Sequence, residues 1–299
     1  MRKAKKVRHS VTDKRFEIIL ILILCILGVI VAYPLIYVLS SSFSSPSAVM
    51  SGKVWLLPVD FSLEGYEAIF KNKQVLIGYR NSLFYMVAGT CINVVMTMLA
   101  AYPLSRSDMP GQGPIMLLFT FTMIFSGGMI PTYLVIKNLN MLNSVWSMLI
   151  PGAISVHNMI IARTFIHSSI PHEMLEAAQI DGCSDTQYFL RMVLPLSGSV
   201  IAVITLYYAI AHWNAYFNAF MYLSDQNLYP LQLFLRDILI SNKVDASMVI
   251  IDDGAVAKEG LAELLKYSLI VVAMLPVMVI YPFVQKHFVK GVMIGAVKG

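Results

Sequence analysis

The most regular feature of the chain is a series of apolar runs, each long enough to cross a bilayer. A helix needs roughly 20 apolar residues to span about 30 Å of hydrocarbon. Such runs occupy residues 16–39, 82–104, 115–136, 145–166, 199–220 and 266–284. The pattern predicts an all-α integral membrane protein with six transmembrane helices, which form one transmembrane domain over residues 16–285.

The first run is expected to remain in the mature protein. It is longer than the core of a signal peptide, and Tyr33-Pro34 stands where a small-residue cleavage site would be needed. Composition agrees with a membrane protein, because 58% of the 299 residues are apolar and only 13% are charged. The mean hydropathy is +0.71. Soluble domains carry roughly 25% charged residues.

Positive charge predicts the orientation of the chain. Seven of the 22 Lys and Arg residues lie in the tail 1–15, and positive charge near a span stays on the cytoplasmic side. Six crossings then return the tail 286–299 to the cytoplasm. The net charge of +5 comes largely from the first tail, which indicates contact with lipid head groups rather than nucleic acid.

Two long segments on the outer side, residues 40–81 and 221–265, are expected to cap the bundle. Each contains apolar residues at helical spacing, around residues 66–70 and 231–238, and we expect these helices to pack against the bundle. Glycine and proline interrupt the third run at residues 126–131 and the sixth at Pro276 and Pro282. These breaks are either bends that line a path or kinks that serve packing.

The polar segment 167–197, which we call the elbow, predicts two short helices joined by a tight corner. Pro171 fits a first helical turn, and Asp181-Gly182 supplies a stop. Ser184 with Gln187 three residues later forms a capping-box pattern that begins the second helix. Apolar side chains suited to burial are Met174, Leu175, Ala178, Tyr188, Phe189 and Met192.

The charge of the elbow favours a protein partner over a lipid surface. Lipid-binding helices carry Lys and Arg on their polar face, whereas the elbow holds only Arg191 near its second helix. Its acidic residues are Glu173, Glu176, Asp181 and Asp185. We therefore expect the elbow to dock on a protein in the cytoplasm.

The same residues resemble the EAA loop of ABC importer permeases. The matching positions are Glu176, Ala177, Ala178, Asp181, Gly182, Phe189 and Pro195. The resemblance extends over nearly the whole chain to carbohydrate permeases of the maltose-transporter type, and includes Trp213-Asn214 and the closing residues Gly295, Ala296, Val297, Lys298 and Gly299. The run 125–133 resembles a subgroup linked to uptake of oligosaccharides derived from polysaccharides.

The resemblance implies a transport subunit of the bacterial plasma membrane, with both termini in the cytoplasm. It would pair with a second permease as a heterodimer, receive a carbohydrate from an extracellular solute-binding lipoprotein, and move it by alternating access. Two cytoplasmic ABC ATPase subunits would bind ATP and Mg, so this chain would bind no cofactor itself. Glu176 and Gly182 would lie at the joint with an ATPase, and residues 295–299 would either enter the ATPase interface or form a frayed terminus.

The fifth run supplies the side chains expected of a sugar path, since sugars present hydroxyl pairs and flat C–H faces to amides and aromatic rings. The candidate lining residues are Tyr207, Tyr208, His212, Trp213, Asn214, Tyr216 and Asn218. Such residues can also join two helices within a membrane, and in the maltose-type family the other permease provides most of the sugar contacts. Both interpretations remain open.

The main alternative is an ion-coupled secondary carrier of small solutes. Such a carrier would normally hold a carboxylate in mid-membrane, but the predicted spans hold none except Glu17 at an edge. His157, Asn158 and Arg163 are therefore expected to serve the structure of the bundle. A membrane enzyme would need a nucleophile motif, a phosphate-binding loop or a metal site, and HExxH, GxSxG and GxxxxGK[ST] are absent from the sequence.

Overall fold

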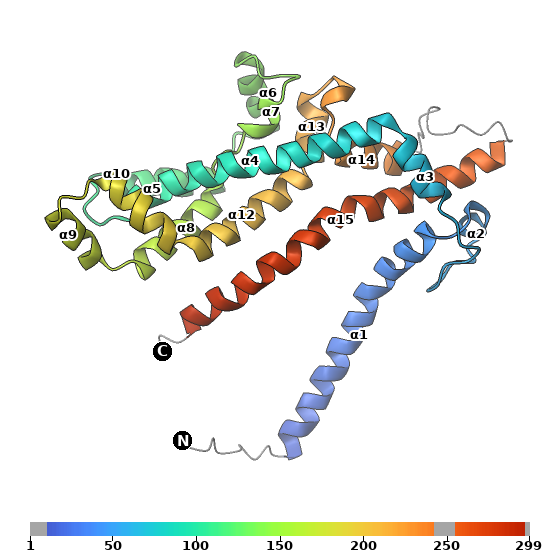
Figure 1. Cartoon of the computed structure of the whole chain (residues 1–299), viewed down its shortest axis with the longest axis horizontal. Coiled ribbons are helices and arrows are strands. Elements are labelled where there is room, and N and C mark those ends of the chain that lie inside the picture. The colour runs from blue at the N-terminus through green and yellow to red at the C-terminus, as the bar shows by residue number, and fades with distance from the viewer. Residues whose placement is uncertain (1–10, 242–254, 297–299) are drawn as a thin grey trace. The chain divides into compact units, whose positions relative to one another are not determined.

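The computed structural model describes residues 11–241 and 255–296, which form helices joined by turns without a β-strand among them (Figure 1). The all-α prediction is confirmed. The helices are α1 Val11–Ser42, α2 Pro46–Met50, α3 Glu64–Lys71, α4 Lys73–Ser105, α5 Gln112–Ile124, α6 Met129–Asn138, α7 Trp146–Leu149, α8 Val156–Ser169, α9 His172–Ile180, α10 Asp185–Tyr188, a π-helical turn Phe189–Val193, α11 Leu194–Leu196, α12 Gly198–Trp213, α13 Tyr216–Tyr222, a 3-10 turn Gln226–Leu228, α14 Leu231–Ser241 and α15 Ala255–Ala296.

The chain divides into two compact units. The first draws on Met1–Lys71 and Val244–Val272, and the second on Asn72–Lys243 and Ala273–Gly299. Helix α15 therefore contributes its first half to one unit and its second half to the other.

In the first unit, α1 is apolar on all sides, and its most apolar window contains no buried residue. A helix that is apolar all round and lies exposed suits a hydrocarbon environment. Its carboxyl-terminal end is held by α15, where the rings of Tyr37 and Tyr267 meet edge to face at 5.7 Å. Helix α3 comes so close to α15 that a Cβ on Gly65 would lie 2.3 Å from Ser268 Oγ, so glycine is required there.

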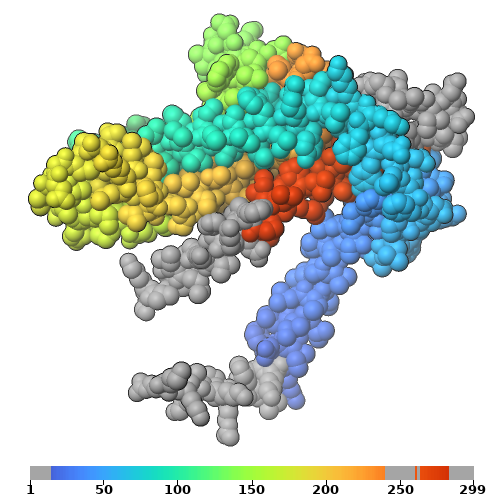
Figure 2. Space-filling view, viewed as in Figure 1, coloured from blue at the N-terminus to red at the C-terminus, as the bar shows by residue number. Residues whose placement is uncertain are grey.

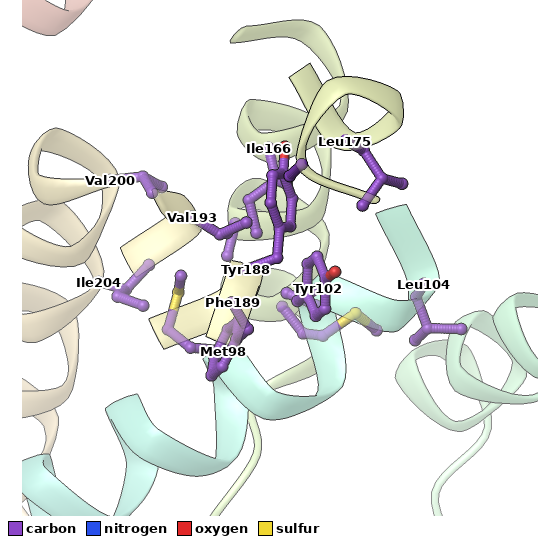
Figure 3. Close-up of a cluster of buried hydrophobic side chains, with 14 of the residues drawn as sticks. Met98, Tyr102, Leu104, Ile166, Leu175, Tyr188, Phe189, Val193, Val200 and Ile204 are labelled. Atoms are coloured by element: carbon purple, nitrogen blue, oxygen red, sulfur yellow. The ribbon is translucent and has the colours of Figure 1, made fainter. Parts of the chain in front are cut away.

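In the second unit, α8 and α12 pack along α4. Near the amino-terminal end of α4, hydrogen bonds fasten the segment that precedes α14: Asn81 Nδ2 donates to Asn227 O at 2.7 Å, and Tyr85 Oη donates to Leu228 O at 2.8 Å. Helix α14 buries Leu231 and Ile238, as the helical spacing in this segment predicts. Near the other end of α4, a buried apolar cluster joins α4, α8, α12 and the elbow (Figure 3).

The predicted third span is not one straight helix. It consists of α5 and α6, which are bent by 114° relative to each other. Gly128 precedes α6 with a φ of +85°, a positive-φ conformation that glycine adopts without steric cost. The glycine signal at residues 126–131 therefore marks a sharp bend.

Two further predicted spans are interrupted, and one expected break is absent. Residues 145–166 divide into α7 and α8, and residues 199–220 divide into α12 and α13. Helix α15 runs without a break through Pro276 and Pro282. Length and hydropathy mark three of the described helices as able to cross a membrane, or five if each bent helix pair is counted as one span. The count of six remains a prediction.

Candidate functional site

The elbow consists of two helices that meet at a corner, as its capping signals predict. Helix α9 ends at Ile180, and Gly182 follows with a φ of +75°. Ser184 Oγ accepts a hydrogen bond from Gln187 N at 3.3 Å, and Gln187 Oε1 accepts one from Ser184 N at 3.2 Å. This capping box fixes the start of α10. Pro171 stands at the N-cap of α9, one position before the first helical residue.

One face of the elbow is buried and holds it to the bundle. Leu175 and Ala178 of α9, together with Tyr188 and Phe189, belong to the apolar cluster shown in Figure 3. Two of the predicted coupling residues, Ala178 and Phe189, thus face inward and cannot touch a partner directly. Met192, expected to be buried, is 39% exposed.

The opposite face of the elbow is exposed, and it forms a rounded surface at one end of the second unit (Figure 2). The other predicted coupling residues lie at the surface: Glu176, Ala177, Asp181, Gly182 and Pro195. The Glu176 carboxylate lies 3.5 Å from His172 Nδ1 and leaves 65% of its side chain exposed.

Ile180 is part of this exposed face but is absent from the sequence-based candidates. It is 86% exposed, the highest value among the large exposed apolar residues of the described chain. Helical spacing could have predicted this exposure, because Leu175 and Ala178 define the buried face of α9 and Ile180 falls outside it. The exposed face of the elbow thus combines one large apolar side chain with the carboxylates of Glu176 and Asp181.

The second unit also holds a cavity of about 500 Å³ between α4, α8 and α12. Its polar lining consists of Asn93, Ser155, His157, Asn158, Tyr207, Tyr208, His212 and Asn218. Among the described residues that line it, none is Asp, Glu, Lys or Arg. The cavity presents amide, hydroxyl, phenol and imidazole groups, which can bind the hydroxyl groups of a sugar.

Hydrogen bonds across the helices fix the cavity wall. The Tyr208 hydroxyl accepts from the backbone N–H of Ser155 at 2.9 Å and pairs with the Thr97 hydroxyl at 2.6 Å. His212 Nε2 lies 3.4 Å from Asn93 Oδ1. These contacts join α12 to α4 and to the start of α8, so a movement of α4 or α12 changes the shape of the cavity.

The predicted path residues divide into two groups. Tyr207, Tyr208, His212 and Asn218 line the cavity. The other three lie outside its lining. Trp213 is 1% exposed, and its indole Nε1 donates to Ala273 O at 3.0 Å. Asn214 Nδ2 donates to Ile210 O, and Tyr216 is exposed beside Phe217.

Four polar residues of the cavity, Asn93, Ser155, His157 and Asn158, are absent from the predicted path. Asn93 lies within the second predicted span, and a polar residue inside a span usually faces a cavity or another helix. That rule, applied to every span, selects Asn93, whereas the predicted path draws on the fifth span alone. His157 and Asn158, expected to serve the bundle, face the same cavity.

The remaining predicted positions lie at the end of the chain. Gly295 and Ala296 are the last residues of α15, whereas Val297, Lys298 and Gly299 lie outside the described residues. Among the described residues, no group of three or more His, Cys, Asp and Glu side chains is placed to hold a metal ion.

Comparison with known proteins agrees with the resemblance noted in the sequence. No protein-family model matches the chain. The chain is 41% identical over 288 residues to the polygalacturonan/rhamnogalacturonan transport system permease protein YtcP of Bacillus subtilis, with 96% of this chain and 99% of that protein covered. It is 38% identical over 284 residues to protein LplC of the same organism, with 95% of each chain covered.

A solved structure is also similar. A chain of a bacterial ABC transporter involved in the import of the acidic polysaccharide alginate superposes with a TM-score of 0.88 at 33% identity, with 95% of this chain and all of that chain covered. Identity above 30% over nearly the full length of both chains shows common ancestry as well as a common fold. The protein therefore belongs to the family of sugar ABC transporter permeases, the membrane-embedded transport subunits of these systems.

Proposed function

We propose that the chain forms half of the translocation path of an ATP-driven importer of acidic oligosaccharides. The observation that carries the proposal is that the elbow and the polar cavity share their supporting helices. Helices α4, α8 and α12 bury the inner face of the elbow at one end and contribute the cavity wall further along. A force applied to the elbow by a partner is therefore applied to the helices that shape the cavity.

The exposed face of the elbow is the proposed docking site for an ATPase subunit. It combines the carboxylates of Glu176 and Asp181 with the exposed side chain of Ile180. Apolar anchors surrounded by polar groups are typical of protein interfaces. Gly182 adds a corner without a side chain, where backbone can approach closely.

An acidic sugar is proposed because two lines of support agree. The transport system of YtcP is named for polygalacturonan and rhamnogalacturonan, and the similar structure belongs to an importer of alginate. The cavity offers the imidazoles of His157 and His212 with neutral amides, and no carboxylate among its described lining residues that would repel an anion. Uronic acid units would thus meet hydrogen-bond donors without a like charge.

The full assembly follows from this function. A second permease completes the path as a heterodimer, two cytoplasmic ABC ATPases bind ATP and Mg, and an extracellular solute-binding lipoprotein delivers the oligosaccharide. The chain lies in the bacterial plasma membrane with six spans and both termini in the cytoplasm. The bent pair α5 and α6 serves as one of these spans.

The test is transport by the purified complex in proteoliposomes. Trigalacturonate and its carboxyl-reduced neutral form are offered with the binding protein outside and ATP inside. We expect ATP-dependent accumulation of trigalacturonate and at least about tenfold less of the neutral form, a difference of about 1.4 kcal/mol. Equal transport of both sugars would overturn the acidic substrate class.

The same vesicles separate this function from the ion-coupled alternative. Ionophores that collapse proton and sodium gradients leave an ATP-driven importer active, whereas they stop an ion-coupled carrier. Uptake that needs an ion gradient and proceeds without ATP would refute the proposed function.

A further inference from the structure

Arg106, the first residue after α4, contacts two segments that are far apart in the sequence. Its NH1 donates to Asp185 Oδ1 at 2.5 Å, a contact across 79 positions of the chain. Its Nε and NH2 donate to the two carboxylate oxygens of Asp108 at 2.9 and 2.5 Å. Only 16% of the Arg106 side chain is exposed, so the guanidinium is held in place rather than free in solvent.

Asp185 is the first residue of α10 and directly follows Ser184, the N-cap residue of that helix. A carboxylate at this position is also favoured by the helix dipole. The ion pair between Arg106 and Asp185 therefore joins the carboxyl-terminal end of α4 to the beginning of the second elbow helix.

An aromatic layer lies beside this ion pair. The ring of Tyr102, one turn before Arg106 on α4, stacks on Phe189 with centroids 5.0 Å apart and meets Tyr188 at 6.4 Å. The Tyr102 hydroxyl accepts a hydrogen bond from Arg106 NH1 at 3.3 Å. Figure 3 shows Tyr102, Tyr188 and Phe189 drawn together within the cluster. The aromatic rings supply packing, and the charged contact fixes the orientation of α10 relative to α4.

The last carbonyl groups of α4 are bonded to α8 and α5. Leu104 O accepts from Arg163 Nε at 2.7 Å and from Gln112 Nε2 at 2.6 Å, and Ser105 O lies 3.0 Å from His167 Nδ1. Carbonyl groups at a helix end have no partner within the helix, so these contacts anchor that end firmly. The end of α4 is therefore a rigid support to which Arg106 ties the elbow.

The covalent connections of the elbow do not include α4. The chain enters the elbow from α8 and leaves it through the π-helical turn and a bend of 79° into α12. A π-helical turn and a bend are places where motion can be absorbed. Contact through Arg106 joins the elbow directly to α4, the helix that contributes Asn93 to the described lining of the cavity.

We propose that Arg106 is a positioning residue for transport, and that its pairing with Asp185 makes the elbow and the end of α4 move as one body when the ATPase acts on the elbow. This inference rests on the proposed function. The simpler role, a local pair with Asp108 that shapes the turn after α4, predicts that the contact with Asp185 is dispensable.

Both partners in the local pair stay charged across physiological pH. The hydrogen bonds from Arg106 lower the pKa of Asp108 to about 2, and the same bonds raise the pKa of Arg106. The experiment can therefore be run at neutral pH with the pair of Arg106 and Asp108 charged.

The test is a double-mutant cycle in the assembled complex, with ATP hydrolysis and sugar uptake measured in the same proteoliposomes. The variants are R106Q, D185N and the double variant, with D108N as the matched control and D185E as the conservative replacement. We expect each single variant to raise the ATP consumed per sugar imported by about fivefold or more, and the double variant to be no worse than either single one. D108N and D185E are expected to stay within about twofold of the unmodified protein.

Asp185 is 64% exposed on its side chain, so D185N keeps the inference testable even if R106Q fails to assemble. Three outcomes would overturn the role of Arg106. They are additive effects in the double variant, an unchanged amount of ATP consumed per sugar imported in D185N, and an increase in D108N as large as in D185N. These outcomes differ from failure of the proposed function, which the unmodified complex would reveal by failing to import the sugar with ATP.

Discussion

Replacing Gly89 with alanine would drive a methyl group into the ring of His212. Gly89 lies on α4, and a Cβ built there would stand 2.4 Å from Cε1 and Nε2 of His212 and 2.8 Å from Cδ2. Carbon atoms in contact lie about 3.5–4.0 Å apart, so the ring must withdraw by about 1 Å. His212 Nε2 already lies 3.4 Å from Asn93 Oδ1, and that contact would be lost.

The magnitude follows from two opposing terms. Overpacking a tight contact costs about 1–3 kcal/mol, whereas replacing glycine by alanine inside a helix gains about 1 kcal/mol. We therefore expect Gly89→Ala to lower the stability of the assembled complex by about 0–2 kcal/mol, from the difference of these terms. The larger effect is on transport, because a displaced His212 changes the wall of the cavity.

The assay compares thermal unfolding and uptake kinetics of trigalacturonate for Gly89→Ala and Gly198→Ala. Gly198 begins α12, the helix that carries His212, and a Cβ there meets nothing within 4 Å. We expect Gly198→Ala to transport normally and Gly89→Ala to lose about tenfold or more in kcat/KM, which corresponds to about 1.4 kcal/mol. Equal kinetics in the two variants would refute the placement of His212 in the path.

Three further outcomes are expected. Gly182 has a φ of +75°, and a Cβ there would meet nothing within 4 Å of this chain, so Gly182→Asn should keep the stability of the elbow, whereas Gly182→Val should cost about 1–2 kcal/mol. Both variants should lower the uptake supported per ATP, because each places a side chain where the ATPase is proposed to approach; normal uptake in Gly182→Asn would contradict that approach. Trp213→Phe removes the indole donor to Ala273 O. It should lower the melting temperature through a loss of about 1–3 kcal/mol in the free energy of unfolding and leave KM for the sugar unchanged. A raised KM would indicate that Trp213 contacts the sugar. The contact of Asp108 with Arg106 lowers the carboxyl pKa from 3.8 to about 2. The stabilisation that this contact provides is therefore complete above about pH 4 and is lost only as the pH falls toward 2. A decline of ATP-driven uptake between pH 8 and 5 in the native protein, but not in Asp108→Asn, would contradict this pH dependence.

Local signals in the sequence predicted the elbow well. Capping residues act over three or four positions, so Ser184, Gln187 and Gly182 specify the two helix ends without help from the rest of the fold. The buried face of α9 was also readable, because Leu175 and Ala178 recur at helical spacing. The same spacing places Ile180 outside the buried face and so predicts that its side chain is exposed.

Long-range pairs and breaks in helices were harder to predict. The pairing of Arg106 with Asp185 joins positions 79 residues apart, and nothing in one sequence links two such charges. Hydropathy measures composition rather than continuity, so the runs 145–166 and 199–220 were predicted as single helices. Their breaks occur at weaker signals, at Pro151-Gly152 and at Asn214, whose side chain bonds back to Ile210 O.

Only part of the cavity lining was predicted from the sequence. Polar residues on one helix do not show which residues of other helices face them. Spacing on the fifth run selected Tyr207 and His212, which line the cavity, but also Trp213, which points to a backbone carbonyl of α15. Which side of a membrane helix faces a cavity depends on its neighbours. The side that faces the cavity is therefore known only from the tertiary structure, in which α4, α8 and α12 lie together.

In the proposed function, the exposed face of the elbow receives the force of ATP hydrolysis. The most direct measurement places a photo-crosslinking amino acid at Ile180 in the complete complex, with the same probe at Leu117 of α5, which is 70% exposed, as the comparison. We expect an Ile180 product that contains the ATPase and a Leu117 product that does not. Crosslinking of Ile180 to lipid alone, with the ATPase present and active, would contradict it.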